Sequence, residues 1–449
     1  MPVTSHRQRV AVLADSDTRW KWGALTANRL VSDIRLDGYL LRGRATPTPR
    51  QLDEVGVRAD SLREVTGVEF LRTVADSAYD VVVLACVGGA VQAMLHGLAR
   101  ATATAAAGPD GVRRKRPVVV TGYVGVVYEK LADGLLLRHG ADLVLANSRH
   151  DAERFRAVYR GVNAGTDSVV ETALPFLGGA RHDEQARGDR PFTVVFAAQP
   201  SVPENRADRT YLLRRAATHA RLHPGREVLV KLRSKPGEHT THIEELPYQK
   251  LAARLPGGLP DNCRLVYGHM GEVLDRTDLL VTVSSTAALE GLHRHIPTAV
   301  LTDLGVREAL GNHHFLGSGC LLSWDELDAG RTPEADAGWL GRQGVAADGP
   351  YETAFDAARN RLAELVAADG LPPIRPYYTN ATAPGYLPGI LARHALDPTG
   401  EPLPGASAEP REEGALRRAT RGFARDAART AYRQGVQRVA PAIRRWGQL

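Results

Sequence analysis

The stretch LLVTVSSTAALEGLHRHIPTAVL, residues 279–301, contains the pattern that decides the fold. Five apolar or β-branched residues come first, three hydroxyl-bearing residues follow, and a helical segment then leads to a second apolar run at 298–301. Unbroken apolarity with β-branched enrichment is typical of a strand that is buried on both faces. A strand, a helix and another strand in succession predict a parallel α/β sheet.

The same pattern recurs in two series along the chain. Strands are predicted at 10–14, 81–86, 118–121 and 143–146, and then at 193–197, 228–232, 279–283 and 298–301. Helical periodicity lies between them, at 91–105, 128–139, 150–159, 209–222 and 287–293. Two such series predict two Rossmann-like, doubly wound parallel-sheet domains that face a central cleft, with ligands at the carboxyl ends of the strands.

The domain limits follow from composition. Residues 172–190, TALPFLGGARHDEQARGDR, have the Pro, Gly and mixed charge of an interdomain linker. We therefore expect an N-terminal domain over 1–175 and a C-terminal domain over 190–370, with the helical segment 350–368 either closing the second domain or packing back across the first. Residues 371–449 are expected to form a Pro/Gly-rich segment and an Arg-rich helical tail.

The positive charge of the protein is concentrated at its C-terminus. The 449 residues carry a formal net charge of +6, but residues 411–449 alone, with ten arginines and three acidic residues, carry +7. The remaining 410 residues sum to −1, so the charge does not indicate a nucleic-acid partner. An Arg-rich amphipathic helix suits an anionic membrane surface; a solvated or packed terminal helix is the alternative.

Several classes of protein and site are excluded by what the sequence lacks. The three cysteines lie far apart, which fits a reducing compartment and neither a disulfide framework nor a zinc site. No signal peptide or membrane-spanning run is present, so we expect a cytoplasmic protein, peripheral on the inner face of the plasma membrane. Dinucleotide, P-loop and HExxH motifs are missing, and we expect neither a metal nor a required cofactor.

The hydroxyl loop of residues 284–286 is the first candidate site. Ser284, Ser285 and Thr286 stand between a buried strand and a helix, where backbone N–H groups and the helix dipole favour a phosphate. Glu290 falls one turn into the helix, within reach of a ribose hydroxyl. A capped helix without a ligand would explain one of the three hydroxyls.

A cationic loop follows the strand at 228–232. The stretch VLVKLRSKPGEHTTH, residues 228–242, places Lys231, Arg233 and Lys235 within five residues. Cations at the carboxyl end of a strand would neutralise a phosphate or carboxylate. A solvated turn is the alternative interpretation.

Candidate bases lie in the N-terminal domain. Asp15 and Asp17 follow the first strand in ADSDTRWKWG, residues 14–23, and a carboxylate there suits a general base; capping of the next helix is the alternative for Asp15. The stretch VVVTGYVGVVYEK, residues 118–130, adds further candidates. Gly122 and Gly125 allow close backbone approach, and Tyr123 adds a polar group. Glu129 is another candidate base.

Four stretches of the chain together resemble a GT-B glycosyltransferase: GADLVLANSRHDAERF (140–155), LPF, VLVKLRS and LLVTVSSTAALEGLHRHIPTAVL. The SSTAALEG stretch is similar to bacterial capsule-type transferases that use CMP-activated ulosonic acids, of the sialyl and Kdo type. Residues 8–370 also resemble an uncharacterised family of glycosyltransferases from high-G+C bacteria. The resemblance implies an N-terminal acceptor domain and a C-terminal nucleotide-sugar donor domain.

The resemblance further implies metal-independent, inverting transfer from a CMP-activated ulosonic acid to a cell-surface polysaccharide or glycolipid. The Ser-Ser/Thr motif of those transferases maps onto Ser284, Ser285 and Thr286. Their His-Pro motif after a strand is absent, as is their acidic base motif, so the base falls to Asp15, Asp17 or Glu129. The alternatives are a UDP- or GDP-sugar-dependent transferase, a UDP-sugar 2-epimerase, and a non-catalytic nucleotide- or polymer-binding protein.

Overall fold

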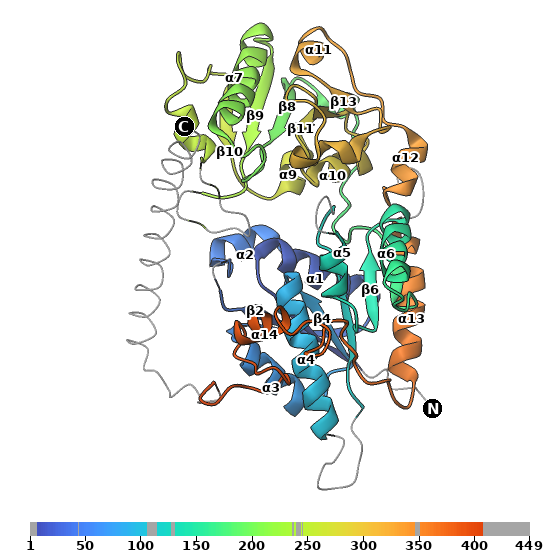
Figure 1. The fold of residues 1–449 in the computed structure, drawn as a ribbon. Helices are drawn as coiled ribbons and strands as arrows, with labels where there is room; N and C mark the ends of the chain where they lie inside the picture. The colour runs from blue at the N-terminus through green and yellow to red at the C-terminus, as the bar shows by residue number, and fades with distance from the viewer. Residues whose placement is uncertain are drawn as a thin grey trace. The chain divides into compact units, whose positions relative to one another are not determined.

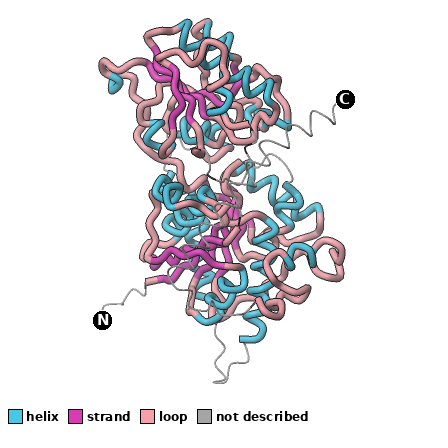
Figure 2. Tube along the Cα trace, turned by 90° about the vertical axis from the view of Figure 1, so that its left-hand side faces the viewer, coloured by secondary structure: helices cyan, strands magenta, loops and turns pink. Residues whose placement is uncertain are grey.

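The computed structural model describes residues 7–43, 45–105, 115–126, 131–235, 238, 244, 246–345 and 351–406. The chain divides into two units: unit 1 combines Met1–Phe176 with Arg342–Glu409, and unit 2 contains Leu177–Gly341 (Figure 1). In each unit the strands form a parallel sheet that helices accompany (Figure 2). Two parallel-sheet, Rossmann-like α/β units confirm the predicted fold class.

The sheet of unit 1 has seven strands in the described residues, all parallel, in the order β3-β2-β1-β4-β5-β6-β7. They are β1 (Gln8–Ala14), β2 (Ile34–Leu41), β3 (Ser61–Val65), β4 (Val81–Ala85), β5 (Val118–Gly122), β6 (Leu143–Ala146) and β7 (Val169–Glu171). Alternate residues of β1 enter different cores: Ala11 and Leu13 join one cluster, and Val10 and Val12 join the other. Burial on both faces is why residues 10–14 of this strand are apolar without interruption.

Helices cover both faces of this sheet. One core receives side chains of α3 (Gly67–Asp76), α4 (Gly88–Ala105), α6 (Arg149–Gly161) and α14 (Leu387–Ala392). The opposite core receives α1 (Asp17–Leu30) and α13 (Asp356–Ala367). Two short helices, α2 (Pro49–Val55) and α5 (Leu131–Leu136), complete the unit's named α-helices in its described residues.

Helix α13 belongs to unit 1, which corrects the domain limits expected from sequence. Ala358 and Leu362, both buried, pack in the same cluster as Val10 and Trp20, so the helix covers the β1 face of unit 1. The segment 350–368 therefore packs back across the first domain and does not close the second. Residues 371–406 continue in unit 1 through α14, and the predicted tail lies outside the described residues.

The sheet of unit 2 has six strands in the described residues, all parallel, in the order β10-β9-β8-β11-β12-β13. They are β8 (Phe192–Ala197), β9 (Arg226–Lys231), β10 (Cys263–Val266), β11 (Leu279–Thr282), β12 (Thr298–Leu301) and β13 (Leu321–Leu322). Accompanying helices include α7 (Arg206–Leu222), α8 (Tyr248–Ala252), α9 (Met270–Leu274), α10 (Ala287–His293), α11 (Trp324–Asp328) and α12 (Ala337–Arg342).

The two sheets place their first strands alike. In unit 1, β1 lies between β2 and β4; in unit 2, β8 lies between β9 and β11. The strand order reverses at the β1/β4 pair and at the β8/β11 pair. In open α/β sheets, ligands bind beyond the carboxyl ends of strands at such a topological switch point. The loops after β1, β4, β8 and β11 are therefore the places to look for a site.

All eight strands predicted from apolar runs are present, within two residues at each end. Predicted helix 287–293 coincides with α10, whereas predicted helix 128–139 is reduced to α5 in the described residues. The border between the units, at Phe176 and Leu177, falls inside the predicted linker. Among the described residues, no helix is both long and apolar enough to cross a lipid bilayer.

Candidate functional site

The switch point of unit 2 is bridged by Gln199 and Ser284. Gln199 Oε1 accepts from the backbone N–H of Ser284 at 2.9 Å, and Gln199 Nε2 donates to Ser284 Oγ at 3.2 Å. Ser284 Oγ in turn donates to the carbonyl oxygen of Leu310 at 2.5 Å, and the residue is 1% exposed. Ser284 thus joins the ends of β8 and β11 to the loop after β12, and its hydroxyl is occupied by the protein itself.

The next two residues are more accessible. Ser285 and Thr286 are half-buried. The N–H of Ser285 donates to Thr282 Oγ1 at 3.1 Å, and Ser285 Oγ accepts from the N–H of Ala287 at 3.2 Å. Thr286 occupies the N-cap position of α10 but its side chain makes no capping hydrogen bond. Of the three predicted hydroxyls, those of Ser285 and Thr286 are the ones placed to meet a ligand, and Glu290 is 9% exposed within α10.

The predicted cationic loop lies on the same edge as the hydroxyl loop. Lys231 is paired in register with Ala197, and Ala197 with Thr282, so the three residues form one row across β9, β8 and β11. With neighbouring strands about 4.8 Å apart, the two loops leave the sheet roughly 10 Å from one another. The sequence-predicted donor residues are therefore brought together.

Within the cationic loop, the three basic residues differ in exposure. Lys231 is 8% exposed and its Nζ donates to the carbonyl oxygen of Leu232 at 2.7 Å. Arg233 is half-buried. Lys235 is exposed, and its ammonium lies 5.9 Å from the centroid of the Tyr267 ring. Arg233 and Lys235 are thus accessible to a ligand, whereas Lys231 is buried.

Arg209 shapes the loop after β8 and was missed from the sequence. This residue of α7 is 1% exposed, and its Nη1 donates to the carbonyl oxygens of Gln199, Pro200 and Pro203 at 3.0–3.3 Å. Its Nη2 pairs with Glu244 at 2.8 Å. A buried guanidinium that binds three carbonyl oxygens of one loop fixes that loop. An arginine in a helix full of arginines gives no sequence signal of this role.

The switch point of unit 1 is bridged by Asp15. Its Oδ1 pairs with Arg19 Nη1 at 2.9 Å, and its Oδ2 accepts from the backbone N–H of Val87 at 2.9 Å. Ser16, and not Asp15, is the N-cap of α1, and Asp17 begins that helix. Both oxygens of Asp15 are engaged, so this carboxylate joins the ends of β1 and β4 and is poorly suited to accept a proton. Glu129 lies outside the described residues.

The loop after β5 is held by two buried side chains. Arg138 Nε donates to the carbonyl oxygen of Gly122 at 3.0 Å, and its guanidinium lies 4.1 Å from the centroid of the Tyr123 ring. Asn147 Nδ2 donates to the carbonyl oxygen of Tyr123 at 2.7 Å. A Cβ on Gly122 would come within 2.8 Å of the Leu145 carbonyl oxygen, which accounts for the glycine. Burial raises the pKa of Tyr123, and these residues shape the loop.

Two further titratable residues of unit 1 were missed from the sequence. Asp151, in the first turn of α6, is 4% exposed, and burial raises its pKa to about 6. Its Oδ1 has no hydrogen-bond partner among the described residues, with Arg154 Nη1 3.8 Å away. His394 follows α14 and lies within electrostatic range of Asp15, which is 379 positions earlier in the chain. No local motif marks either residue.

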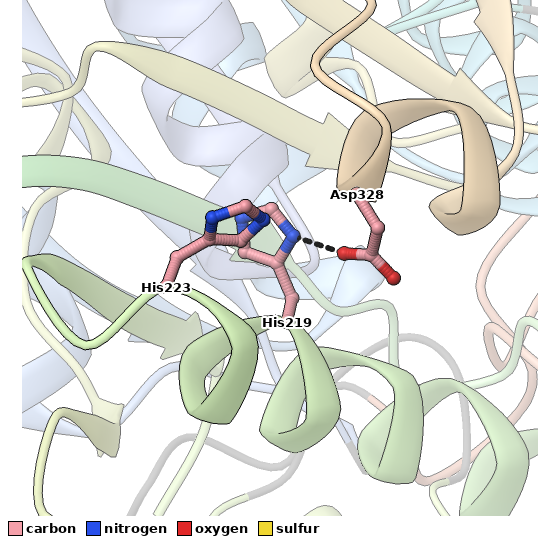
Figure 3. Close-up of side chains that lie close together, drawn as sticks. All are labelled: His219, His223 and Asp328. Atoms are coloured by element: carbon pink, nitrogen blue, oxygen red, sulfur yellow. Dashed lines mark hydrogen bonds and ion pairs between the residues drawn. The ribbon is translucent and has the colours of Figure 1, made fainter.

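A cluster of His219, His223 and Asp328 presents metal-binding atom types elsewhere in unit 2 (Figure 3). His219 Nδ1 lies 2.5 Å from Asp328 Oδ1, while Arg226 Nη1 donates to His219 Nε2 at 3.2 Å. A metal on Nδ1 would require a proton on Nε2, facing that guanidinium donor. The cluster lies where α7 ends and β9 begins, at the sheet edge opposite the cationic loop. The side chains of His219 and Asp328 are already hydrogen-bonded to one another and to arginines, whereas His223 Nε2 is buried with no hydrogen-bond partner among the described residues. Burial lowers the pKa of both histidines.

Comparison with known protein families gives a match over most of the chain. The sequence model of the family described as "Putative glycosyltransferase (DUF6716)" matches residues 10–365. No curated protein matches the chain. The family match is therefore the finding on which an assignment can rest.

Solved structures give distant similarities. UDP-GlcNAc 2-epimerase from Neisseria meningitidis bound to UDP-GlcNAc is 10% identical, with a TM-score of 0.47, 80% of this chain covered and 99% of that chain. The glycotransferase of kitacinnamycin is 12% identical, with a TM-score of 0.38 and coverages of 94% and 99%. Spinosyn rhamnosyltransferase SpnG is 15% identical, with a TM-score of 0.40 and coverages of 81% and 97%.

Proposed function

The chain belongs to the DUF6716 family of glycosyltransferases, and from this membership we propose that it transfers a sugar from a nucleotide donor bound by unit 2. The acceptor in this proposal is a cell-surface glycan or a glycolipid, bound by unit 1. The proposal includes neither a metal nor a resident cofactor.

One observation carries the placement of the donor. The row Lys231–Ala197–Thr282 directs the cationic loop and the hydroxyl loop to the same edge of the sheet, at its switch point. Cationic side chains and oriented N–H groups are what a phosphate needs. Arg233 and Lys235 would neutralise the phosphate, and the Ser285–Thr286 segment would donate hydrogen bonds to it. Because cations of the protein fill this role, a metal is not required.

The same groups support the chemistry of transfer. The acceptor hydroxyl oxygen forms a bond to the anomeric carbon as the bond between that carbon and the phosphate oxygen breaks. Negative charge then grows on the leaving phosphate, where Arg233 and the Ser285–Thr286 segment would stabilise it. Attack opposite the leaving group inverts the anomeric centre.

For the donor we propose a CMP-activated ulosonic acid. Such a donor carries a phosphodiester and a carboxylate, and the two accessible cations of the loop, Arg233 and Lys235, suit two separate anions. A thermal-shift screen with CMP, UDP, GDP and TDP tests this choice. Selective stabilisation by CMP supports the ulosonic-acid donor, and selective stabilisation by UDP or GDP replaces it with the corresponding sugar nucleotide.

Calorimetry on variants tests the site. Removing a charge-assisted hydrogen bond costs about 1.5–3 kcal/mol, so Arg233→Ala is expected to weaken nucleotide binding by roughly 10- to 100-fold. The double variant Ser285→Ala/Thr286→Ala is expected to weaken it also. Arg264→Ala is the matched control, because Arg264 lies within β10, is mostly exposed and pairs with Glu227. Unchanged binding in both site variants would show that the donor binds elsewhere.

Product analysis separates transfer from the other activities. Release of free nucleotide from the sugar nucleotide marks transfer or hydrolysis. An epimerised sugar nucleotide without nucleotide release marks a 2-epimerase, and nucleotide binding without any turnover marks a non-catalytic binding protein. Each of those two results would contradict the proposed function.

We also propose that residues 411–449 hold the enzyme at the inner face of an anionic membrane, where a lipid-linked acceptor lies. The support is their formal charge of +7 together with interspersed apolar residues. Co-sedimentation with phosphatidylglycerol vesicles is expected for the full chain and not for a chain that ends at residue 410. Equal sedimentation of the two chains would remove this part of the proposal.

A further inference from the structure

Two histidines and an aspartate of unit 2 converge where α7 meets α11. His219 lies in the last turn of α7, His223 is the C-cap of that helix, and Asp328 is the last residue of α11. One ligand atom from each residue lies within 4.8 Å of those of the other two. Figure 3 shows the His223 ring against the His219 ring, and their centroids are 4.5 Å apart. Histidines four positions apart on a helix form a well-known pair of zinc ligands.

A hydrogen-bond network accounts for two of these three side chains. His219 Nδ1 lies 2.5 Å from Asp328 Oδ1, and Asp328 Oδ2 accepts from Arg215 Nη2 at 2.8 Å. His223 Nε2 is buried and has no hydrogen-bond partner among the described residues. A buried polar atom without a partner destabilises the fold unless something binds it. The network thus leaves one nitrogen unexplained, and that nitrogen faces the other two groups as a third ligand.

We propose that His219, His223 and Asp328 bind a divalent transition-metal ion of the zinc class. The ion takes the place of the proton between His219 Nδ1 and Asp328 Oδ1, and His223 Nε2 and a water complete four ligands. Two imidazoles, a carboxylate and a water suit zinc, whose ligand distances of about 2.0–2.2 Å place ligand atoms roughly 3.3 Å apart. The contact of 2.5 Å therefore widens when the ion enters. The carbonyl end of α7 adds a potential that favours a cation.

Arg226 is the group that opposes the ion. Its Nη1 donates to His219 Nε2 at 3.2 Å, which holds the neutral ring with its proton on Nδ1. With the ion on Nδ1 that proton moves to Nε2, so Arg226 has to give up this hydrogen bond. Its guanidinium carbon also lies 4.9 Å from the centroid of the Phe192 ring, a partner that it can retain. Removal of Arg226 should therefore strengthen metal binding.

The ion would connect two helices that are distant in the sequence. His219 and Asp328 are 109 positions apart, and an ion that binds only their folded arrangement stabilises unit 2. The cluster lies at the sheet edge opposite the cationic loop, so the ion takes no part in sugar transfer. This inference is independent of the proposed function.

Calorimetry with zinc chloride on the full chain, first stripped with a chelator, tests the site. His223→Gln is the sharpest variant, because the His223 side chain makes no hydrogen bond to a described residue and the fold should persist. Loss of an outer partner of a ligand costs about 10- to 100-fold in metal affinity. Loss of the ligand itself is therefore expected to cost about 100-fold or more. Asp328→Asn, which keeps an acceptor for His219, should also weaken binding.

Arg226→Met separates a metal site from a purely structural network. It removes a positive charge beside the ion and is expected to tighten zinc binding by about 10-fold or more. A structural network predicts no gain in this variant. His182→Gln, at a histidine of unit 2 outside the cluster, is the matched control and should bind zinc as wild type does.

Cobalt(II) provides a readout of the coordination itself. Four-coordinate cobalt absorbs visible light strongly, so wild type with cobalt chloride should become coloured and His223→Gln should not. Zinc should also raise the melting temperature of wild type and leave that of His223→Gln unchanged. Equal zinc affinity in wild type, His223→Gln and Asp328→Asn would overturn the proposal. The absence of zinc binding by wild type would overturn it as well.

Discussion

The Gln199 side chain holds the backbone N–H and the hydroxyl of Ser284 at once, at 2.9 and 3.2 Å, and thereby joins the ends of β8 and β11. In unit 1 the corresponding pair of strand ends, β1 and β4, is joined by Asp15 and the Val87 N–H. A polar side chain thus joins the two strand ends at each switch point. In unit 2 the residues that follow this bridge are Ser285 and Thr286, for which we propose contacts to the donor phosphate.

Replacing Gln199 tests whether this bridge positions the hydroxyl loop. Gln199→Ala removes the acceptor that Gln199 Oε1 offers to the buried N–H of Ser284, which should cost about 1–3 kcal/mol of unfolding free energy. Nucleotide affinity should fall as Ser285 and Thr286 lose their support. Gln199→Glu keeps an acceptor for the N–H and should retain more stability. A Gln199→Ala protein that binds nucleotide as tightly as wild type would show that the bridge serves stability alone.

Arg209→Met should destabilise unit 2 strongly. The change removes hydrogen bonds to three carbonyl oxygens and the ion pair with Glu244, whose side chain is 8% exposed. Breaking a buried ion pair from one side costs about 3–5 kcal/mol, which urea unfolding would detect as a lower midpoint. Arg221→Met, on the same helix but exposed, should change stability by about 0.5 kcal/mol or less. Equal midpoints for the two variants would contradict the role given to Arg209.

Asp151→Asn should stabilise unit 1 above pH 6. The carboxyl group has a pKa near 6 when folded against 3.8 for its ordinary value, so the folded state binds its proton more tightly than the unfolded state. Its ionisation therefore costs stability, fully above pH 6 and not at all below pH 3.8, by about 3 kcal/mol as an upper figure. Thermal melts from pH 4 to 8 should show the gain of the variant growing with pH. A gain that is constant with pH would contradict burial as the cause.

Phe355→Ala should lower the stability of unit 1 and spare unit 2. Phe355 is 1% exposed and packs in the core between α13 and the β1 face. Truncating a buried phenylalanine costs about 3–5 kcal/mol. Hydrogen exchange resolved by peptide should show faster exchange in β1, β4 and α1 and unchanged exchange in β8 and β11. Phe355→Leu should show a smaller effect, and faster exchange in unit 2 alone would contradict the assignment of α13.

The strands were predictable because burial on both faces imposes a local pattern. The run at 279–283 consists of apolar or β-branched residues, since α10 and the other helices leave no face of β11 in water. The cationic and hydroxyl loops were predictable for a related reason: parallel strands end at one edge, so polar residues directly after them converge. This inference does not depend on the order of the strands in the sheet. Lys231 and Thr282, in one row at the same edge, agree with it.

What the sequence did not reveal depends on contacts between distant segments. The pattern of residues 356–367 shows an amphipathic helix but not which sheet receives its apolar face, and α13 packs on unit 1. Ser284 was given the same role as Ser285, because the Leu310 carbonyl that takes its hydroxyl comes from another loop. His394 stands in a Pro/Gly-rich segment, and the packing of α14 on α4 brings it to the start of α3, beside Gly67.

The return of the chain to unit 1 has a consequence for synthesis. The ribosome completes residues 177–341 before it makes α13 and α14, so the described part of unit 2 is complete while unit 1 still lacks two of its covering helices. Domains generally fold as units during translation, the N-terminal one first. In this protein unit 1 is completed after unit 2. The apolar surface of Val10 and Val12 in β1 lacks its cover by α13 until the last quarter of the chain has been made. We therefore expect nascent unit 1 to keep apolar surface exposed until α13 has been made.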